Sequence, residues 1–122
     1  MFTYEQLTGR LSHDGELMGT GYSGLAEGKN NPAMERIHDV GPIPRGSYTI
    51  GPEFQSEKHG PVVHKLAPND GTDEYGRDGF LMHGDSNAHP GAASLGCIVI
   101  GRPTRLAVSA LQQAGDDQLT VV

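Results

Sequence analysis

Apolar residues occur in short runs along the chain, and turn-forming residues separate these runs. Within several runs the apolar positions alternate with polar ones, which is the period of a strand with one buried face. The Asp14-Gly15 step between two such runs predicts a hairpin. The runs at 80–83 and 97–100 are the most apolar, so we expect them to be inner strands. In full, the pattern predicts strands at residues 2–4, 6–11, 16–19, 47–50, 62–66, 80–83, 97–100 and 119–122.

One segment has the pattern of a helix, and we expect it to run from about Pro103 to Ala114. Pro103 suits a first helical turn, Gly115 suits a C-terminal stop, and the apolar residues between them share one face. Residues 24–32 have the composition of a loop, and residues 33–37 form one helical turn at most. The predicted fold class is therefore mostly β, with many short strands and one helix in the C-terminal half. A chain of 122 residues is expected to form a single domain, residues 1–122.

The composition agrees with short strands joined by tight turns. The chain has 18 glycines and 8 prolines, which a helical bundle would not tolerate, while 35% of its residues are hydrophobic. Its net charge of −6, without any cluster of Lys and Arg, argues against a nucleic-acid partner. No apolar run has the length needed to span a bilayer, so we expect no membrane insertion.

The first residues and the cysteine count bear on the compartment. Residues 1–6 lack the charged and apolar regions of a signal peptide, so we expect synthesis in the cytoplasm without a signal peptide. Export would then use a route that needs no such signal. The single cysteine, Cys97, excludes an internal disulfide and any metal site built from several cysteines.

The segment around Cys97 carries the strongest chemical signal. Cys97 ends a Ser94-Leu95-Gly96-Cys97 turn, and His83-Gly84 ends the apolar run before it. A thiol that attacks a carbonyl needs a base for its proton and backbone N–H donors for the oxyanion. We therefore predict Cys97 as the nucleophile, His83 as the base and the N–H groups of Gly96 and Cys97 as oxyanion donors. Ser94 would hold either the His83 ring or the loop.

Other interpretations of these residues stay open. A lone cysteine is most often a buried, inert thiol. A zinc site formed by His83, His89 and Cys97 is the metal alternative, but the usual short zinc motifs are missing, so no metal and no cofactor is expected. Asp85 would either orient His83 or cap a turn. We interpret four further histidines as surface residues: His13, His38, His59 and His64.

The His-Gly pair followed by Ser-x-Gly-Cys resembles the active-site signature of L,D-transpeptidases. Residues 41–50 resemble the Pro- and Gly-containing strand that precedes the signature in that fold. The resemblance is closest to the small branch of effectors that type VI secretion delivers, and it covers nearly the whole chain. It implies an L,D-transpeptidase-like β-sandwich or barrel. Two positions depart from the typical pattern: Leu95 replaces a second histidine, and Val99 replaces an arginine.

The resemblance also implies a function, that of an antibacterial toxin acting on peptidoglycan tetrapeptide stems in the periplasm of a target cell. Cys97 would displace the terminal D-alanine and form a thioester. Water, a free D-amino acid or another stem would then resolve the thioester, giving carboxypeptidase, exchange or cross-linking activity, of which we favour the first two. The implied partners are the stem peptides, a cognate immunity protein and components of the type VI system.

The substrate is anionic, so we expect local cations to bind it. The candidate substrate-binding residues are Arg77, Arg45, Arg102, Lys65, Gly84, Asp85 and His89. The alternative function is a non-catalytic module that binds the cell wall or a partner protein and carries an inert cysteine. A papain-like amidase that cuts an earlier stem bond is a weaker alternative. In papain-like hydrolases the cysteine precedes its histidine, whereas here His83 precedes Cys97 and no histidine follows.

Overall fold

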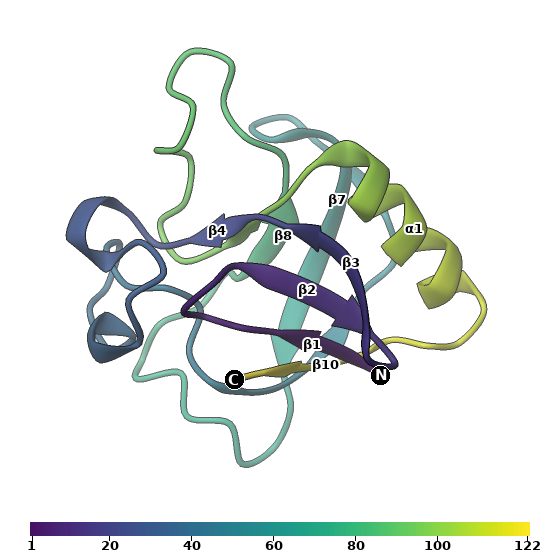
Figure 1. Cartoon of the computed structure of the whole chain (residues 1–122), viewed down its shortest axis with the longest axis horizontal. Coiled ribbons are helices and arrows are strands. Elements are labelled where there is room, and N and C mark those ends of the chain that lie inside the picture. Colours follow the sequence, from purple (N-terminus) through teal and green to yellow (C-terminus); the bar gives the residue numbers. More distant parts are fainter.

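A computed structural model describes residues 1–122 and shows a mostly β chain with a single α-helix (Figure 1). The helix α1 (Arg102–Gln113) lies between the last two strands. Two short 3-10 helices, η1 (Ala26–Gly28) and η2 (Pro32–Met34), lie in the segment predicted as loop and one helical turn. The strands are β1 (Phe2–Tyr4), β2 (Arg10–His13), β3 (Glu16–Thr20), β4 (Tyr22–Ser23), β5 (Gly46–Ile50), β6 (Phe54–Ser56), β7 (Gly60–Pro68), β8 (Leu81–His83), β9 (Ile98–Val99) and β10 (Gln118–Val121).

The strands form one mixed ten-stranded sheet, which confirms the predicted fold class. Its order is β3-β2-β1-β10-β5-β7-β8-β9-β4, and β6 pairs with β7 beside this path. The pairs β1–β10 and β8–β9 are parallel, and all the others are antiparallel. In Figure 1 the strands β1, β2 and β10 run across the direction of β7 and β8. The sheet therefore curls around a core instead of lying flat.

Most predicted elements are present, with shifts at their ends. The hairpin at Asp14-Gly15 is confirmed, since β2 and β3 pair across it. The helix begins and ends one residue earlier than predicted. The inner position of the two most apolar runs is also confirmed, because β8 lies between β7 and β9, and β9 lies between β8 and β4.

The predicted strand at 6–11 is wrong in its first half. Residues 6–8 form a turn, and β2 begins only at Arg10. Gln6 is fully buried there, and its side-chain amide donates to a Glu35 carboxylate oxygen and to the Ile43 carbonyl. A buried amide with two acceptors fixes a turn that the alternation of residues does not reveal. The short strands β4 and β6, of two and three residues, were not predicted.

A single cluster of 14 buried residues fills the space enclosed by the sheet and the helix. Val108 is the helix residue in this cluster, and α1 packs against β7. The helix has 12 residues, and none of the helices is long and apolar enough to cross a membrane. The cluster consists of Phe2, Tyr4, Leu11, Ile43, Tyr48, Ile50, Leu66, Phe80, Met82, Ile98, Ile100, Val108, Leu119 and Val121.

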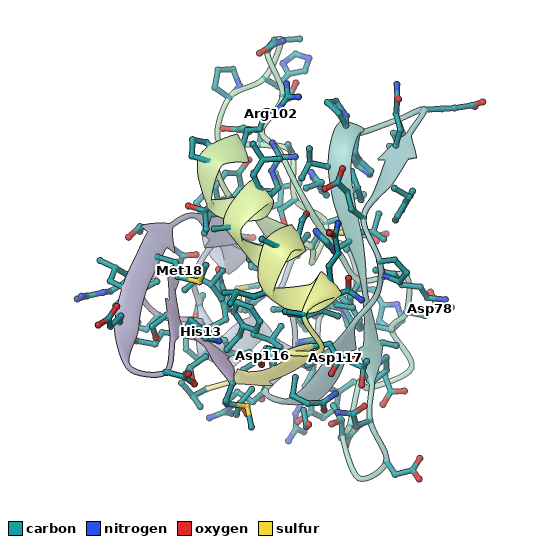
Figure 2. The ribbon with its side chains drawn as sticks, turned by 90° about the vertical axis from the view of Figure 1, so that its right-hand side faces the viewer. His13, Met18, Asp78, Arg102, Asp116 and Asp117 are labelled. Atoms are coloured by element: carbon teal, nitrogen blue, oxygen red, sulfur yellow. The ribbon has the colours of Figure 1, made fainter.

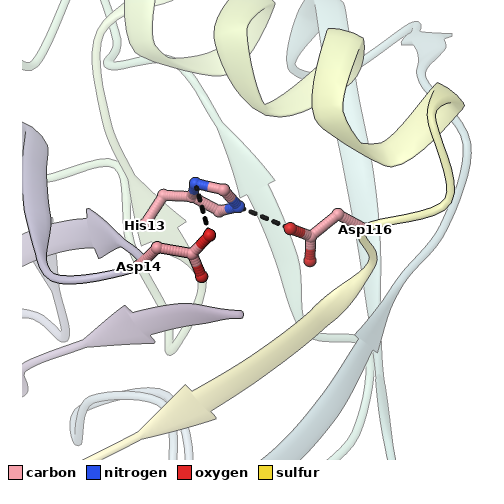
Figure 3. Close-up of side chains that lie close together, drawn as sticks. All are labelled: His13, Asp14 and Asp116. Carbon is pink, nitrogen blue, oxygen red and sulfur yellow. Dashed lines mark hydrogen bonds and ion pairs between the residues drawn. The ribbon is translucent and has the colours of Figure 1, made fainter.

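Polar contacts at both ends of α1 tie it to the N-terminal hairpin. Near its beginning, the Thr104 hydroxyl donates to the Met18 carbonyl at 3.2 Å. In the turn after the helix, Asp116 meets His13 of β2 with 2.5 Å between Nε2 and Oδ2 (Figures 2 and 3). Asp14 lies on the other side of the ring, 3.8 Å from Nδ1. His13 is therefore a contact between the first and last elements and not the free surface residue that the sequence suggested.

His64 was also interpreted as a surface residue, and this prediction is wrong. Its side chain in β7 is fully buried. Nδ1 lies 2.7 Å from the Gly51 carbonyl, and Nε2 lies 2.7 Å from the Ser109 hydroxyl of α1. Because a carbonyl only accepts, we assign the proton to Nδ1. The Ser109 hydroxyl then lies between two acceptors, His64 Nε2 and the Arg105 carbonyl at 3.0 Å, and its one hydrogen serves one of them at a time. His64 thus joins the helix to the sheet.

We expect Ser109→Ala to lower the free energy of unfolding by about 1–3 kcal/mol, because it leaves the buried His64 Nε2 without a partner. Denaturant unfolding followed by circular dichroism measures the change. Gln113→Ala, at an exposed position of the same helix, is the matched control and should leave the stability nearly unchanged. Equal stability of Ser109→Ala and the wild type would show that the buried hydrogen bond does not couple α1 to β7.

Candidate active site

The parallel pairing of β8 with β9 brings the two predicted catalytic residues together. Met82 pairs with Ile98 and His83 with Val99, so Cys97 lies just before β9 while His83 ends β8. Both side chains line one cleft of about 510 Å³. The same cleft is bordered by Asp39, Lys58, His59, Asp78, Gly79, Phe80, Leu81, Ser86, His89, Ala92, Ala93, Leu95 and Gly96.

His83 is held as a neutral imidazole with one free nitrogen. Its ring is fully buried, and Nδ1 lies 2.7 Å from the Gly84 carbonyl. Since that carbonyl can only accept, Nδ1 carries the proton and Nε2 keeps a lone pair. Nε2 is itself buried and makes no hydrogen bond, including none to the Cys97 sulfur. A base-competent tautomer is therefore fixed by a backbone carbonyl that no side-chain motif reveals.

Electrostatics keep His83 uncharged. Burial is the largest cause that lowers its pKa, to about 4, and the nearby His59, Arg105 and Lys58 lower it further, while the Gly84 carbonyl opposes the change. Burial also raises the pKa of the Cys97 thiol above its ordinary value. The Cys97 sulfur lies 3.8 Å from the Gly79 carbonyl, and a backbone hydrogen bond from Leu81 opposes the effect of burial on its pKa. At neutral pH the pair is thus a thiol and a neutral imidazole, which is the starting state for general-base activation.

Ser94 holds the turn that carries Cys97 and not the His83 ring. Its buried hydroxyl donates to the Cys97 carbonyl at 2.6 Å and accepts from the N–H groups of Gly24 and Gly96. The Gly96 N–H is thereby occupied. The Cys97 N–H has no hydrogen-bond partner, so of the two predicted oxyanion donors it is the free one.

Gly96 is required by both conformation and space. Its φ of +131° lies in the region that favours glycine, and a Cβ there would lie 2.4 Å from Arg77 Nη2. Arg77 is buried, and its guanidinium donates to four backbone carbonyls: those of Glu35, Gly41, Pro42 and Leu95. Arg77 therefore supports the Cys97 turn, and it does not line the cleft that holds Cys97.

The remaining predicted cations occupy different places. Arg45 is exposed and pairs with Glu35 at 2.7 Å outside the cleft. Arg102, at the beginning of α1, lines a second cleft of about 700 Å³ together with His59, Gly84 and Asp85 (Figure 2 labels Arg102). Lys65 is exposed and borders neither cleft. Lys58, which sequence analysis missed, is exposed and lines the Cys97 cleft.

The loop between β8 and β9 is ordered by Asp85, which caps it. The Asp85 carboxylate accepts from the Tyr22 hydroxyl at 2.7 Å and from the N–H groups of Ser86 and Gly91. Asp85 does not contact His83, so of its two predicted roles the structure supports the turn cap. His89 lies in this loop and lines the Cys97 cleft. Leu95, the first departure from the typical signature, is 49% exposed at the cleft, whereas Val99, the second, is buried.

His59 is a further histidine whose position the sequence analysis did not predict. It was interpreted as a surface residue, but its ring stacks on that of His83 with 3.8 Å between centroids and 17° between planes. It comes from the turn between β6 and β7, and it borders both clefts. No spacing in the sequence links His59 to His83, because the contact arises from the pairing of β7 with β8.

The support beneath the site depends on Glu35. Its buried carboxylate accepts from Gln6, from the Arg45 side chain and from the Arg45 N–H, while its carbonyl accepts from Arg77. Burial alone would raise the pKa of Glu35, but these hydrogen bonds outweigh it and lower the pKa to about 2. The charged carboxylate thus links the N-terminal turn to the residues around Arg77.

We expect Glu35→Gln to lower the free energy of unfolding at pH 7 by about 1–3 kcal/mol, because it weakens charge-assisted hydrogen bonds. A carboxylate with a depressed pKa stabilises the fold above its ordinary pKa and loses this effect as the pH falls through the folded value. The wild type should therefore lose stability between about pH 4.5 and pH 2, and the variant less so. Denaturant unfolding at pH 7 and pH 3 measures this; identical pH slopes would contradict it.

We expect Ser94→Ala to loosen the turn before Cys97, since the N–H groups of Gly24 and Gly96 lose a shared acceptor. Stability should fall by about 1–3 kcal/mol. The rate at which iodoacetamide alkylates Cys97 should change as well, because the sulfur is no longer held in place. Ser12→Ala, in β2 and outside both clefts, is the control. An unchanged alkylation rate in Ser94→Ala would show that the hydroxyl does not position the nucleophile.

Comparison with known protein families gives one match, and comparison with curated proteins gives none. The Tlde1 domain, which describes a family of type VI L,D-transpeptidase effectors, matches residues 18–121. The match includes Cys97, His83 and every strand from β4 to β10, whereas β1 and β2 precede it. The chain belongs to the Tlde1 domain family, and the resemblance seen in the sequence is confirmed.

Proposed function

We propose that this member of the Tlde1 domain family is a cysteine-dependent enzyme that acts on the tetrapeptide stems of peptidoglycan. It would work as an L,D-carboxypeptidase, as a D-amino acid exchange enzyme, or as both, with residues 1–122 as one catalytic domain. One observation carries the proposal: Cys97 and His83 share a cleft in which the Gly84 carbonyl leaves Nε2 free to accept a proton. The family match supports the effector class and the peptidoglycan target.

The first step is proton transfer from the Cys97 thiol to His83 Nε2. The sulfur then attacks the carbonyl between the L-centre of the diamino acid and the terminal D-alanine. The free N–H of Cys97 is the donor available for the oxyanion, and each such donor contributes about 100- to 1000-fold in rate. The tetrahedral intermediate collapses when the C–N bond breaks and His83 returns its proton to the departing amine. A thioester on Cys97 and free D-alanine remain.

The second step releases the acyl group. Water or the amine of a free D-amino acid gives its proton to His83 and attacks the thioester, so that the sulfur leaves as a thiol. Water gives a trimmed stem, and the amino acid gives an exchanged one. A cleft of about 510 Å³ in a small domain holds one peptide more readily than two strands, which favours these outcomes over cross-linking.

Two cations are placed to recognise the carboxylates of the stem. Lys58 is exposed at the Cys97 cleft, and Arg102 is exposed at the adjoining one. Arg77 and Arg45 are engaged with carbonyls and with Glu35, so they act on the substrate only through the fold. The enzyme would be delivered by the type VI system to the periplasm of a target cell and neutralised in the producer by a cognate immunity protein.

The alternative is a non-catalytic module that binds wall fragments or a partner protein. It is favoured by the burial of His83 and by the missing hydrogen bond between Nε2 and the sulfur. It predicts that tetrapeptide muropeptides stay unchanged and that Cys97→Ala keeps every biological effect.

We expect the wild-type protein to remove D-alanine from purified tetrapeptide muropeptides, or to replace it with an added D-amino acid, as measured by mass spectrometry. Cys97→Ser and His83→Gln should each lower the rate by at least about 1000-fold, because the nucleophile and its base act as a unit. His38→Ala, at an exposed histidine outside both clefts, is the control and should keep full activity.

Muropeptides left unchanged by the wild type would rule the enzymatic proposal out. Equal turnover by Cys97→Ser and the wild type would rule out the acyl-enzyme mechanism. Product mass also separates the papain-like alternative, since a cut at an earlier stem bond releases a larger fragment than D-alanine.

A further inference from the structure

His59 is fixed over the ring of His83 by the turn that carries it. The turn joins β6 to β7, and the His59 N–H donates to the Ser56 hydroxyl at 3.0 Å. Gly60 follows with a φ of +81°, which turns the chain back into β7. Because β7 pairs directly with β8, this turn lies next to the end of β8, where His83 stands. The stacked geometry, 3.8 Å and 17°, is thus set by strand pairing.

The surroundings leave His83 one ring atom, Nε2, that can accept a proton. One face of the ring is covered by His59, Nδ1 is bound to the Gly84 carbonyl, and the whole residue is inaccessible to solvent. Nε2 is the only polar atom of the ring without a partner. His59 also borders the second cleft, so this residue lies between that cleft and the one that holds Cys97. Without its ring, water from the second cleft would gain access to the imidazole.

The charged groups that lower the pKa of His83 all belong to basic residues. Lys58 and His59 approach from the β6–β7 turn, and Arg105 approaches from α1. Cys97 and the carboxylates of Asp39 and Asp78 lie on the Cys97 cleft, and Asp85 follows Gly84 but is engaged with Tyr22. No carboxylate forms a hydrogen bond or ion pair with the ring, whose one partner is the Gly84 carbonyl. Protonation of His83 is therefore resisted both by burial and by neighbouring positive charge.

We infer that His59 is a positioning residue for the proposed reaction: its ring seals the face of His83, excludes water from it and keeps Nε2 as the one site open to the Cys97 proton. The inference rests on the proposed function in taking Cys97 and His83 as the reacting pair. The effect of His59 on His83 can be tested separately, because the stacked ring controls the protonation of His83 whether or not the protein turns over a substrate. The aromatic ring, and not its ionisation, is the part of His59 that matters.

The test is an NMR titration of the imidazole resonances of His83 in the wild type, His59→Ala, His59→Phe and His38→Ala. In the wild type His83 should titrate near pH 4 and show a proton on Nδ1. His59→Ala should raise the pKa of His83 toward the ordinary imidazole value of about 6.5, because it hydrates the ring. His59→Phe keeps an aromatic cover and should preserve the low pKa. His38→Ala should behave as the wild type.

The acidic limb of kcat/KM on tetrapeptide muropeptides is the second measurement. It should move to higher pH in His59→Ala and stay in place in His59→Phe. An unchanged His83 titration in His59→Ala would overturn the inference, and so would a His59→Phe variant that titrates like His59→Ala. The NMR measurement needs no turnover, so an inactive protein with the expected titrations would refute the proposed function and leave the role of His59 standing. If His59→Ala does not fold, the titrations of the wild type and of His59→Phe still test the inference. A His83 pKa near 6.5 in either protein would contradict the claim that an aromatic ring at position 59 excludes water from His83.

Discussion

The site depends on one structural constraint, the parallel pairing of β8 with β9. The two strands are only three and two residues long, yet their register fixes where His83 and Cys97 lie. Parallel strands need a long connection, and here the loop 84–97 supplies it while carrying Asp85, Ser94 and Gly96. A shift of one residue in this register would turn His83 to the other face of the sheet. The apolar side chains of Met82 and Ile98, both buried in the core, hold the register against such a shift.

Two buried arginines support this pairing from opposite sides, and neither forms an ion pair with a carboxylate. Arg77 donates to carbonyls of residues 35–42 and to Leu95, and thereby holds the Cys97 turn. Arg105 donates to the carbonyls of Ile100, Pro61 and Val62, and thereby holds the end of the β6–β7 turn near the His83–Gly84 corner. A guanidinium has five donors in a fixed plane, so it can satisfy several loop carbonyls that no secondary structure pairs. The chain thus uses buried positive charge for architecture, and among the Lys and Arg residues that line the two clefts only Lys58 and Arg102 are exposed.

The sequence predicts those features that depend on neighbouring residues, but it does not predict contacts between residues that are far apart in the chain. The hairpin at Asp14-Gly15, the helix and the inner strands follow from turn residues and from the spacing of apolar positions, and the structure has them all. Local spacing does not show that His64 reaches Ser109 or that His59 covers His83, because both contacts join elements that meet only after the sheet has formed. The same holds for Arg77, whose charge suggested a substrate ligand although its guanidinium is buried among carbonyls. Charge and residue type identified the Cys97 turn, whereas burial decided what each neighbouring side chain does.

The protonation states of the site bear on how its reactivity is controlled. Burial moves the pKa of Cys97 up and that of His83 down, so the resting pair is neutral and not a thiolate–imidazolium ion pair. A resting thiolate would react with any small electrophile, whereas a buried neutral pair transfers its proton only when another charge is stabilised at the same time. In the proposed mechanism this condition is met when a substrate carbonyl lies against the sulfur. The negative charge then moves to the carbonyl oxygen, which lies beside the free Cys97 N–H. In the proposed reaction the low basicity of His83 has a matching advantage at the end of the first step, because a weakly basic imidazole returns its proton readily to the leaving amine. The same burial that makes the thiol unreactive toward solvent also makes the transfer of its proton to His83 uphill. In the proposed mechanism this transfer therefore depends on a bound carbonyl whose oxygen takes up the negative charge.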